Sequence, residues 1–206
     1  MDTIQTLGSV LVLGFAAGIR LYAALFALGL GIHFGVLPLT SGMSHLAVLS
    51  DTRVLMATGA ACVIEFFADK IPWLDSMWDS VHTFIRPLGA AVLSFTALGD
   101  SDPALKVIMF VLCGGVAFTG HSSKAAARIA ANHSPEPFSN IALSAAEDLF
   151  VPGLVWMALH HPLLVAAFVV LFVAAFAFVA PRVFRAIRAE WRALTGWISG
   201  RRQPAE

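Results

Sequence analysis

Long apolar runs separated by short polar stretches form the pattern of this chain. Six runs are apolar enough to suggest membrane segments, although a full helical span needs about 20 residues. The third run is only about a dozen residues long, so it would cross completely only if the preceding helix contributes. The pattern predicts an all-α, polytopic membrane helix bundle with segments at residues 7–37, 54–68, 87–98, 104–131, 139–159 and 162–180.

The composition strengthens this interpretation. The chain is 58% hydrophobic and only 13% charged, whereas soluble domains average about 25% charged residues. Lys and Arg together number 13, as do Asp and Glu, so the charge balance predicts no nucleic-acid partner. Cys62 and Cys113 lie in apolar runs, without a CxxC motif or a disulfide framework. We therefore expect membrane lipids to be the main surroundings of the chain.

Basic residues in the short polar stretches predict the orientation, because Lys and Arg favour the cytoplasmic side of a membrane. The tail carries Arg182, Arg185, Arg188, Arg192, Arg201 and Arg202, and its basic residues alternate with apolar ones at helical spacing. We expect residues 181–206 to form a cytoplasmic amphipathic tail after a bundle at 1–180. With six segments the N-terminus is cytoplasmic too, although Arg53 and Lys106 oppose this orientation.

A weak internal repeat links the two halves. GFAAGIRLYAALFAL resembles GGVAFTGHSSKAAAR, and CVIEFFADKIP resembles LSAAEDLFVPG. One interpretation is a pair of inverted three-segment repeats, residues 7–98 and 104–180, with Pro- and Gly-broken helices, an arrangement typical of transporters. The other is chance similarity between short Ala-rich stretches.

The stretch EFFADKIPWLDSMWDSVHTFIRP, residues 65–87, concentrates charge at the end of an apolar segment. Pro72 cannot continue a helical hydrogen-bond ladder, so we expect one helix to end near Lys70 and another to cover 73–85. Four- and three-residue spacings put the polar side chains of the second helix on one face. The candidate ion- or substrate-binding residues here are Glu65, Asp69, Lys70, Asp75, Asp79, His82 and Arg86. For Asp75, Asp79 and His82 the alternative is a solvated cytoplasmic face.

Polar groups in the other segments complete the candidate site. They are Arg20, His121, Lys124, Arg128, Asn140, Ser144, Glu147 and Asp148. An ionisable group in hydrocarbon costs a few kcal/mol at least, so we expect these side chains to pair or to line a wet cavity. The simplest pairing joins the acids Glu65, Asp69, Glu147 and Asp148 to Arg20, Lys124 and Arg128. Purely structural ion pairs are the alternative.

Four motifs resemble those of a bacterial membrane family known as domain of unknown function 4126. They are GFAAGIRLY, EFFADKIPWLDSMWDSVHTFIRP, HSSKAAAR with Asn132, and SNIALSAAED, and they cover most of residues 10–150. Ile141 departs from the family pattern, which has proline after the asparagine. The resemblance implies a multi-pass protein of the bacterial inner membrane and marks the charged motifs as the site, but the family name states no function.

Three functions fit these observations. The first is a transporter or channel-like protein that moves an ion or small solute through paired intramembrane charges and requires no cofactor. The second is an enzyme acting on a phospholipid or prenyl phosphate, with Asp75 and Asp79 holding a divalent cation such as Mg²⁺ and Lys124 and Arg128 holding phosphate. The third is a lipid- or partner-binding scaffold without turnover. The sequence leaves a homo-oligomer open.

Overall fold

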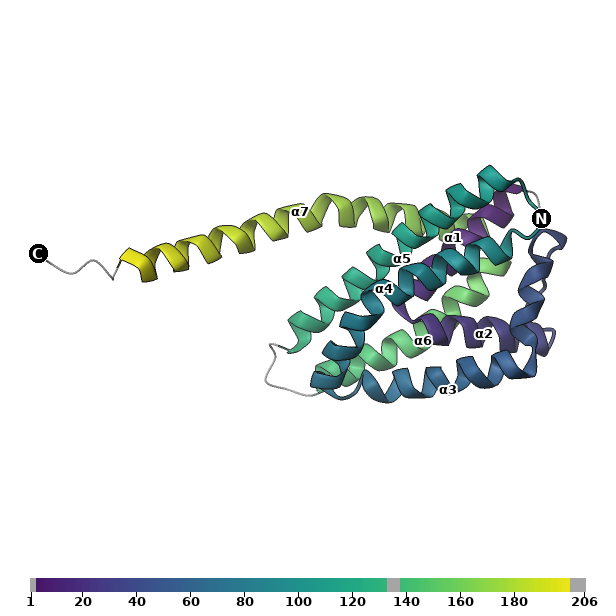
Figure 1. Ribbon diagram of the computed structural model, residues 1–206, viewed down its shortest axis with the longest axis horizontal. Coiled ribbons are helices and arrows are strands. Elements are labelled where there is room, and N and C mark those ends of the chain that lie inside the picture. Colours follow the sequence, from purple (N-terminus) through teal and green to yellow (C-terminus); the bar gives the residue numbers. More distant parts are fainter. Residues whose placement is uncertain (1–2, 133–137, 201–206) are drawn as a thin grey trace, which may run out of the picture. The chain divides into compact units, whose positions relative to one another are not determined.

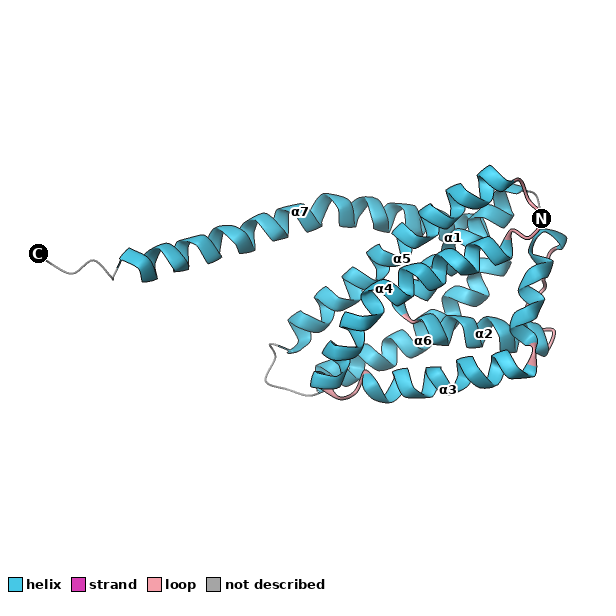
Figure 2. Ribbon diagram, viewed as in Figure 1, coloured by secondary structure: helices cyan, strands magenta, loops and turns pink. Residues whose placement is uncertain are grey.

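The computed structural model describes residues 3–132 and 138–200, and every regular element in these ranges is helical (Figures 1 and 2). The predicted all-α class is therefore confirmed. The elements are α1 (Thr3–Ile19), α2 (Leu21–His33), the 3₁₀ segment η1 (Ser41–Ser50), α3 (Thr52–Ala68), α4 (Pro72–Ala97), α5 (Pro103–Asn132), α6 (Phe138–His160) and α7 (Pro162–Gly200). Of the predicted features, the Asn132 and Asn140 side chains, the Arg192 side chain, Arg201 and Arg202 lie outside the described part.

The described residues divide into two compact units, one ending at Val169 and the other beginning at Val170. Within the first unit, α1 packs against α4, α5 and α6, while α2 packs against α3, η1 and α6. The α4 and α5 helices lie side by side, with α1 beside them (Figure 1). This first unit brings together all the charged motifs.

Among the described residues, three helices contain stretches that are long and apolar enough to cross a membrane: Pro103–Ile129, Ile141–His160 and Pro162–Arg185. A fourth span results if η1 and α3, which are bent by 71° at a short break, count as one. The α1 and α2 helices are apolar but shorter. These long apolar helices indicate a multi-pass membrane protein.

The first predicted segment is not one helix. It breaks at Arg20, whose backbone is extended (φ −144°, ψ 94°) between α1 and α2, and α2 ends at His33. At Gly18 the α1 backbone passes so close to α5 that an added Cβ would lie 2.3 Å from the carbonyl oxygen of Ala117. The close approach holds the end of α1 against α5, and Arg20 leaves the helical path directly after it.

The charged stretch folds partly as predicted. The α3 helix ends at Ala68 and α4 begins at Pro72, which confirms the break at this proline. However, we expected separate segments at 73–85 and 87–98, and α4 is one helix of 26 residues with Pro87 inside it. Pro87 removes one helical hydrogen bond, but packing of α4 against both α5 and α1 outweighs this local preference.

Candidate functional site

Arg20 occupies the centre of a buried cluster of opposite charges. It is fully buried, and the break between α1 and α2 turns its guanidinium toward carboxylates from two other helices. Nη2 lies 3.2 Å from Oδ2 of Asp69, Nε lies 3.9 Å from Oε2 of Glu65, and Nη1 contacts Oδ1 of Asp148. A fully buried guanidinium is tolerated here because these acids surround it.

The end of α3 supplies two of the acids. Glu65 lies in the last turn of α3, and Asp69 follows that helix directly with a helical backbone, so the two acids lie on the same side, and both are fully buried. Oδ2 of Asp69 lies 3.1 Å from Nζ of Lys124 and 3.4 Å from Nη2 of Arg128. Arg128 also donates from Nη1 to the backbone oxygen of Asp69, at 2.8 Å. Arg128 therefore satisfies a carbonyl that the end of a helix leaves without a helical partner.

The polar face of α4 is buried, so its interpretation as a solvated face is wrong. Asp75, Asp79, His82 and Arg86 are 1%, 7%, 3% and 0% exposed. Arg86 Nη2 donates to Oε1 of Glu65 at 2.9 Å, and Nη1 lies 3.0 Å from Oδ1 of Asp79. The spacing predicted correctly that these side chains share one face, and groups from α2, α3 and α5 cover that face.

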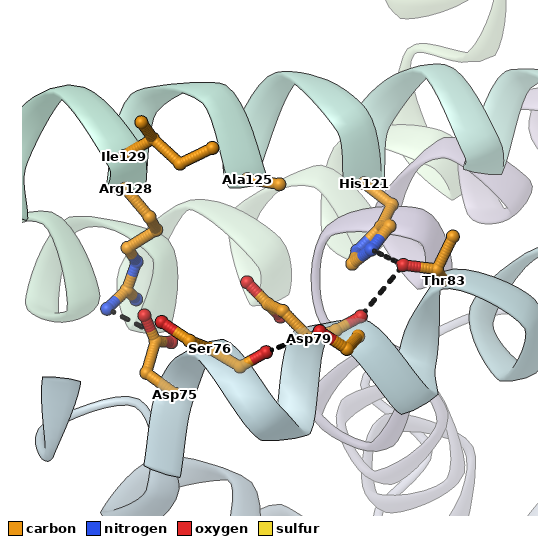
Figure 3. Close-up of a pocket in the computed structure, with 9 residues that line it drawn as sticks. Asp75, Ser76, Asp79, Thr83, His121, Ala125, Arg128 and Ile129 are labelled. Atoms are coloured by element: carbon orange, nitrogen blue, oxygen red, sulfur yellow. Dashed lines mark hydrogen bonds and ion pairs between the residues drawn. The ribbon is translucent and has the colours of Figure 1, made fainter. Parts of the chain in front are cut away.

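The hydrogen-bond partners of His121 define its protonation state. Arg86 Nη1 lies 2.7 Å from its Nδ1, and a guanidinium can only donate, so Nδ1 accepts and carries no proton. Nε2 then carries the proton and donates to Oγ1 of Thr83 at 3.0 Å, and this hydroxyl donates to the backbone oxygen of Asp79 at 2.9 Å (Figure 3). On this assignment His121 is neutral.

The α5 and α6 helices close the cluster on its other side. Lys124 Nζ lies 3.2 Å from Oε2 of Glu147, and Arg128 Nη2 lies 3.1 Å from the same oxygen. Between α3 and α4, Lys70 Nζ contacts Oγ of Ser144 at 3.3 Å and Oδ2 of Asp148 at 3.7 Å.

The predicted pairing of distant charges is therefore confirmed in outline. Asp69, Glu147 and Asp148 meet cations that we expected, but the shortest ion pair of Glu65 is with Arg86, which we had not included in the pairing. Sequence reasoning also missed Thr83, although it lies four residues after Asp79 and thus on the same face of α4. Six carboxylates face five cations here: Glu65, Asp69, Asp75, Asp79, Glu147 and Asp148 against Arg20, Lys70, Arg86, Lys124 and Arg128.

One edge of the cluster opens into a pocket of about 220 Å³ between α4 and α5. Asp75, Asp79 and Thr83 line it from α4, and His121 and Arg128 line it from α5 (Figure 3). The remaining lining residues are Ser76, Ser80, Ala125 and Ile129.

Asp75 is the acid whose pKa responds most clearly to this setting. Burial raises the pKa of Asp75 to about 6, against the opposing effect of Arg128, whose Nη1 lies 3.5 Å from Oδ1 of Asp75. The neighbouring charges of Asp79 and Asp69 raise it further. Burial also lowers the pKa of His82, which favours its neutral form. With both histidines neutral and all six carboxyls ionised, the five cations leave the cluster with one excess negative charge.

The donor set does not favour a metal. Within residues 3–132 and 138–200, no group of three or more His, Cys, Asp or Glu side chains is placed to hold a metal ion. Asp75 pairs with Arg128, and Asp79 pairs with Arg86. The two carboxylates proposed for Mg²⁺ thus already face cations from the protein.

These features define an all-helical, multi-pass membrane protein with a buried ion-pair cluster that reaches one surface pocket. The family model described as Domain of unknown function (DUF4126) matches residues 7–182. The chain belongs to this family, as the four motifs indicated. Comparison with curated proteins and with solved structures gave no match.

Proposed function

We propose that this protein is a transporter or channel-like protein of the bacterial plasma membrane, and that the charge cluster is its translocation site for an ion or small solute. The pocket between α4 and α5 is the observation that carries this proposal. Asp75, Asp79, His121 and Arg128 belong both to the pocket wall and to the ion-pair network, so a solute in the pocket meets the buried charges directly.

The charge balance of the cluster supports a proton or a cation as the moving species. One unbalanced negative charge among buried side chains is costly, and binding one proton or one monovalent cation removes it. Asp75 is placed to accept the proton, because it lines the pocket and its pKa is about 6. Its charge then changes within the physiological pH range.

Exchange of ion-pair partners gives a route for movement. Asp69 contacts three cations, and Glu147 contacts two of the same cations, so a solute that displaces one partner leaves the others in place. The helix break at Arg20 lies at the centre of these contacts. Discontinuous helices recur in transporters, where the half-helix ends and the unwound backbone at the break bind the solute or its coupling ion.

A six-segment arrangement completes the proposal. It counts α1 with α2 as the first segment and the second half of α4 as the third, and it places both termini in the cytoplasm. Lys70, Arg86 and Arg128 then lie on the cytoplasmic side, and the pocket opens there. The two halves would be inverted repeats, residues 7–98 and 104–180, in agreement with the weak similarity of their motifs.

Uptake into proteoliposomes under an imposed pH gradient tests the proposal. We expect pH-dependent flux of protons or of a cation from a panel of inorganic and small organic ions, with strong loss in Glu65→Gln and Asp75→Asn. Asp100→Asn is the matched control, since that carboxylate is 98% exposed and outside the cluster. Absence of flux for the whole panel, or equal flux in all variants, would contradict the proposal.

The two other functions have less support. A magnesium ion would bring two positive charges to a cluster with one excess negative charge, and within the described residues no group of three or more His, Cys, Asp or Glu side chains is placed to hold a metal ion. A scaffold without turnover needs the charges for folding only, and buried ion pairs are poor stabilisers compared with apolar packing.

A further inference from the structure

The polar pocket continues into an apolar groove along the same two helices. A second pocket, of about 480 Å³, lies between the later part of α4 and the earlier part of α5. Phe84 and Leu88 line it from α4, and Val111 and Phe118 line it from α5. Thr83 lines both pockets, so the polar pocket and the apolar groove meet at this residue.

The two halves of this surface have comparable lengths. Asp75 to Thr83 and Thr83 to Ala91 are each eight residues of α4, or about 12 Å of helix. The first half presents carboxylates and hydroxyls, and the second presents apolar side chains, of which Phe84 is 80% exposed and Val111 is 66% exposed. A molecule that fits the whole surface has a polar head and an apolar tail.

We propose that the translocation site takes an amphiphile with a primary ammonium head, which enters from the bilayer with its tail in the apolar groove. This inference rests on the proposed function and narrows the class of its solute. The head neutralises the excess negative charge of the cluster and donates to Asp75 and Asp79, while the hydroxyl of Thr83 lies at the junction.

The charge and the shape of this surface favour an ammonium amphiphile over an anionic amphiphile or a small cation. A phosphate or carboxylate head would meet Arg128, but it would also face Asp75 and Asp79 and add a second negative charge to an already negative cluster. A small cation without a tail would leave the groove to ordinary lipid chains. The groove is open at Gly115, where an added Cβ would meet no atom within 4 Å, so there is room for a chain between the helices.

Three probes separate the contributions of head and tail: decylamine with both, ethylamine with the head alone and decanol with the tail alone. Their binding to the detergent-solubilised protein is measured by titration calorimetry. We expect decylamine to bind at least about tenfold more tightly than either other probe, since it alone combines a charge-assisted hydrogen bond with burial of an alkyl chain.

Two variants test the two halves. Gly115→Leu fills the groove without a steric clash at Cβ, so decylamine should bind no better than ethylamine. Gly153→Leu is the matched control, because a Cβ at this position in α6 also meets no atom within 4 Å. Asp79→Asn removes one head contact and should reduce the preference for decylamine over decanol by about tenfold. Thermal unfolding shows that each variant is folded.

The outcomes distinguish this inference from the proposed function. Equal binding of decylamine and decanol to the unmodified protein, or unchanged binding in Gly115→Leu, would overturn the amphiphile site and indicate adventitious apolar contact only. Cation flux with no decylamine preference would leave the transport proposal standing without this solute class. Selective decylamine binding without flux of protons, of any ion in the panel or of decylamine itself in proteoliposomes would support the site and contradict transport.

Discussion

Replacement of Arg20 by glutamine tests whether the cluster acts as one electrostatic unit. Arg20→Gln removes the cation that contacts Glu65, Asp69 and Asp148, and all of its own surface is buried. Loss of one partner from a buried ion pair costs about 3–5 kcal/mol. For Arg20→Gln we expect a cost at the lower end of this range, about 3 kcal/mol, because Asp69 still pairs with Lys124 and Asp148 still pairs with Lys70.

A change of about 3 kcal/mol in a chain of this length corresponds to a melting temperature lower by about 6–12 °C, measured by tryptophan fluorescence in detergent. Adding Asp148→Asn to the Arg20→Gln variant removes one of the acids that have lost Arg20. The double variant should therefore recover about 1–2 kcal/mol of the lost free energy of unfolding. Arg53→Gln is the matched control, since that guanidinium is 87% exposed and pairs only locally with Asp51. Similar melting temperatures for Arg20→Gln and Arg53→Gln would refute the reasoning.

Two further predictions concern pH and packing. The raised pKa of Asp75, about 6 instead of 3.8, means that its ionised form destabilises the fold by up to about 3 kcal/mol above pH 6, and that this penalty declines as the pH falls toward 4. Asp75→Asn should therefore raise the melting temperature at pH 8 and do so much less at pH 4.5; an equal shift at both would contradict this. Gly18→Ala would place Cβ 2.3 Å from the oxygen of Ala117 and should cost about 1–3 kcal/mol. At Gly8 the atoms nearest to an added Cβ would lie at 3.4–3.6 Å, which is ordinary van der Waals contact. Gly8→Ala should therefore melt at or above the temperature of the unmodified protein, and equal losses of stability at Gly8 and Gly18 would count against the packing argument.

Regular spacing made part of the site predictable. The face of α4 follows from intervals of four, three and four residues between Asp75, Asp79, His82 and Arg86, since helical geometry alone puts such residues together. The need to pair charges in an apolar chain then predicted that acids and bases from distant segments would meet, and Asp69 with Lys124 is an example. Both inferences depend on general geometry and solvation.

The remaining features of the fold and the site depend on tertiary contacts, which the pattern of apolar and polar residues along the sequence does not contain. No proline marks the break at Arg20, which coincides with the close approach of Gly18 to α5 and the carboxylates around the guanidinium. Conversely, Pro87 predicted a helix boundary that packing overrides. A wet cavity among the charges was expected, but its position between α4 and α5 was not predictable, because it depends on how closely these two helices approach each other.

Paired neutralisation of Lys124 and Glu147 tests most directly whether the cluster moves solute or only holds the bundle together. These side chains contact each other at 3.2 Å, so Lys124→Met with Glu147→Leu leaves the net charge unchanged, and replacing a buried ion pair by hydrophobic residues of similar volume often preserves stability. Proton-driven flux into proteoliposomes is measured alongside the melting temperature. The account predicts a folded double variant without flux, and a folded double variant with the flux of the unmodified protein would contradict it.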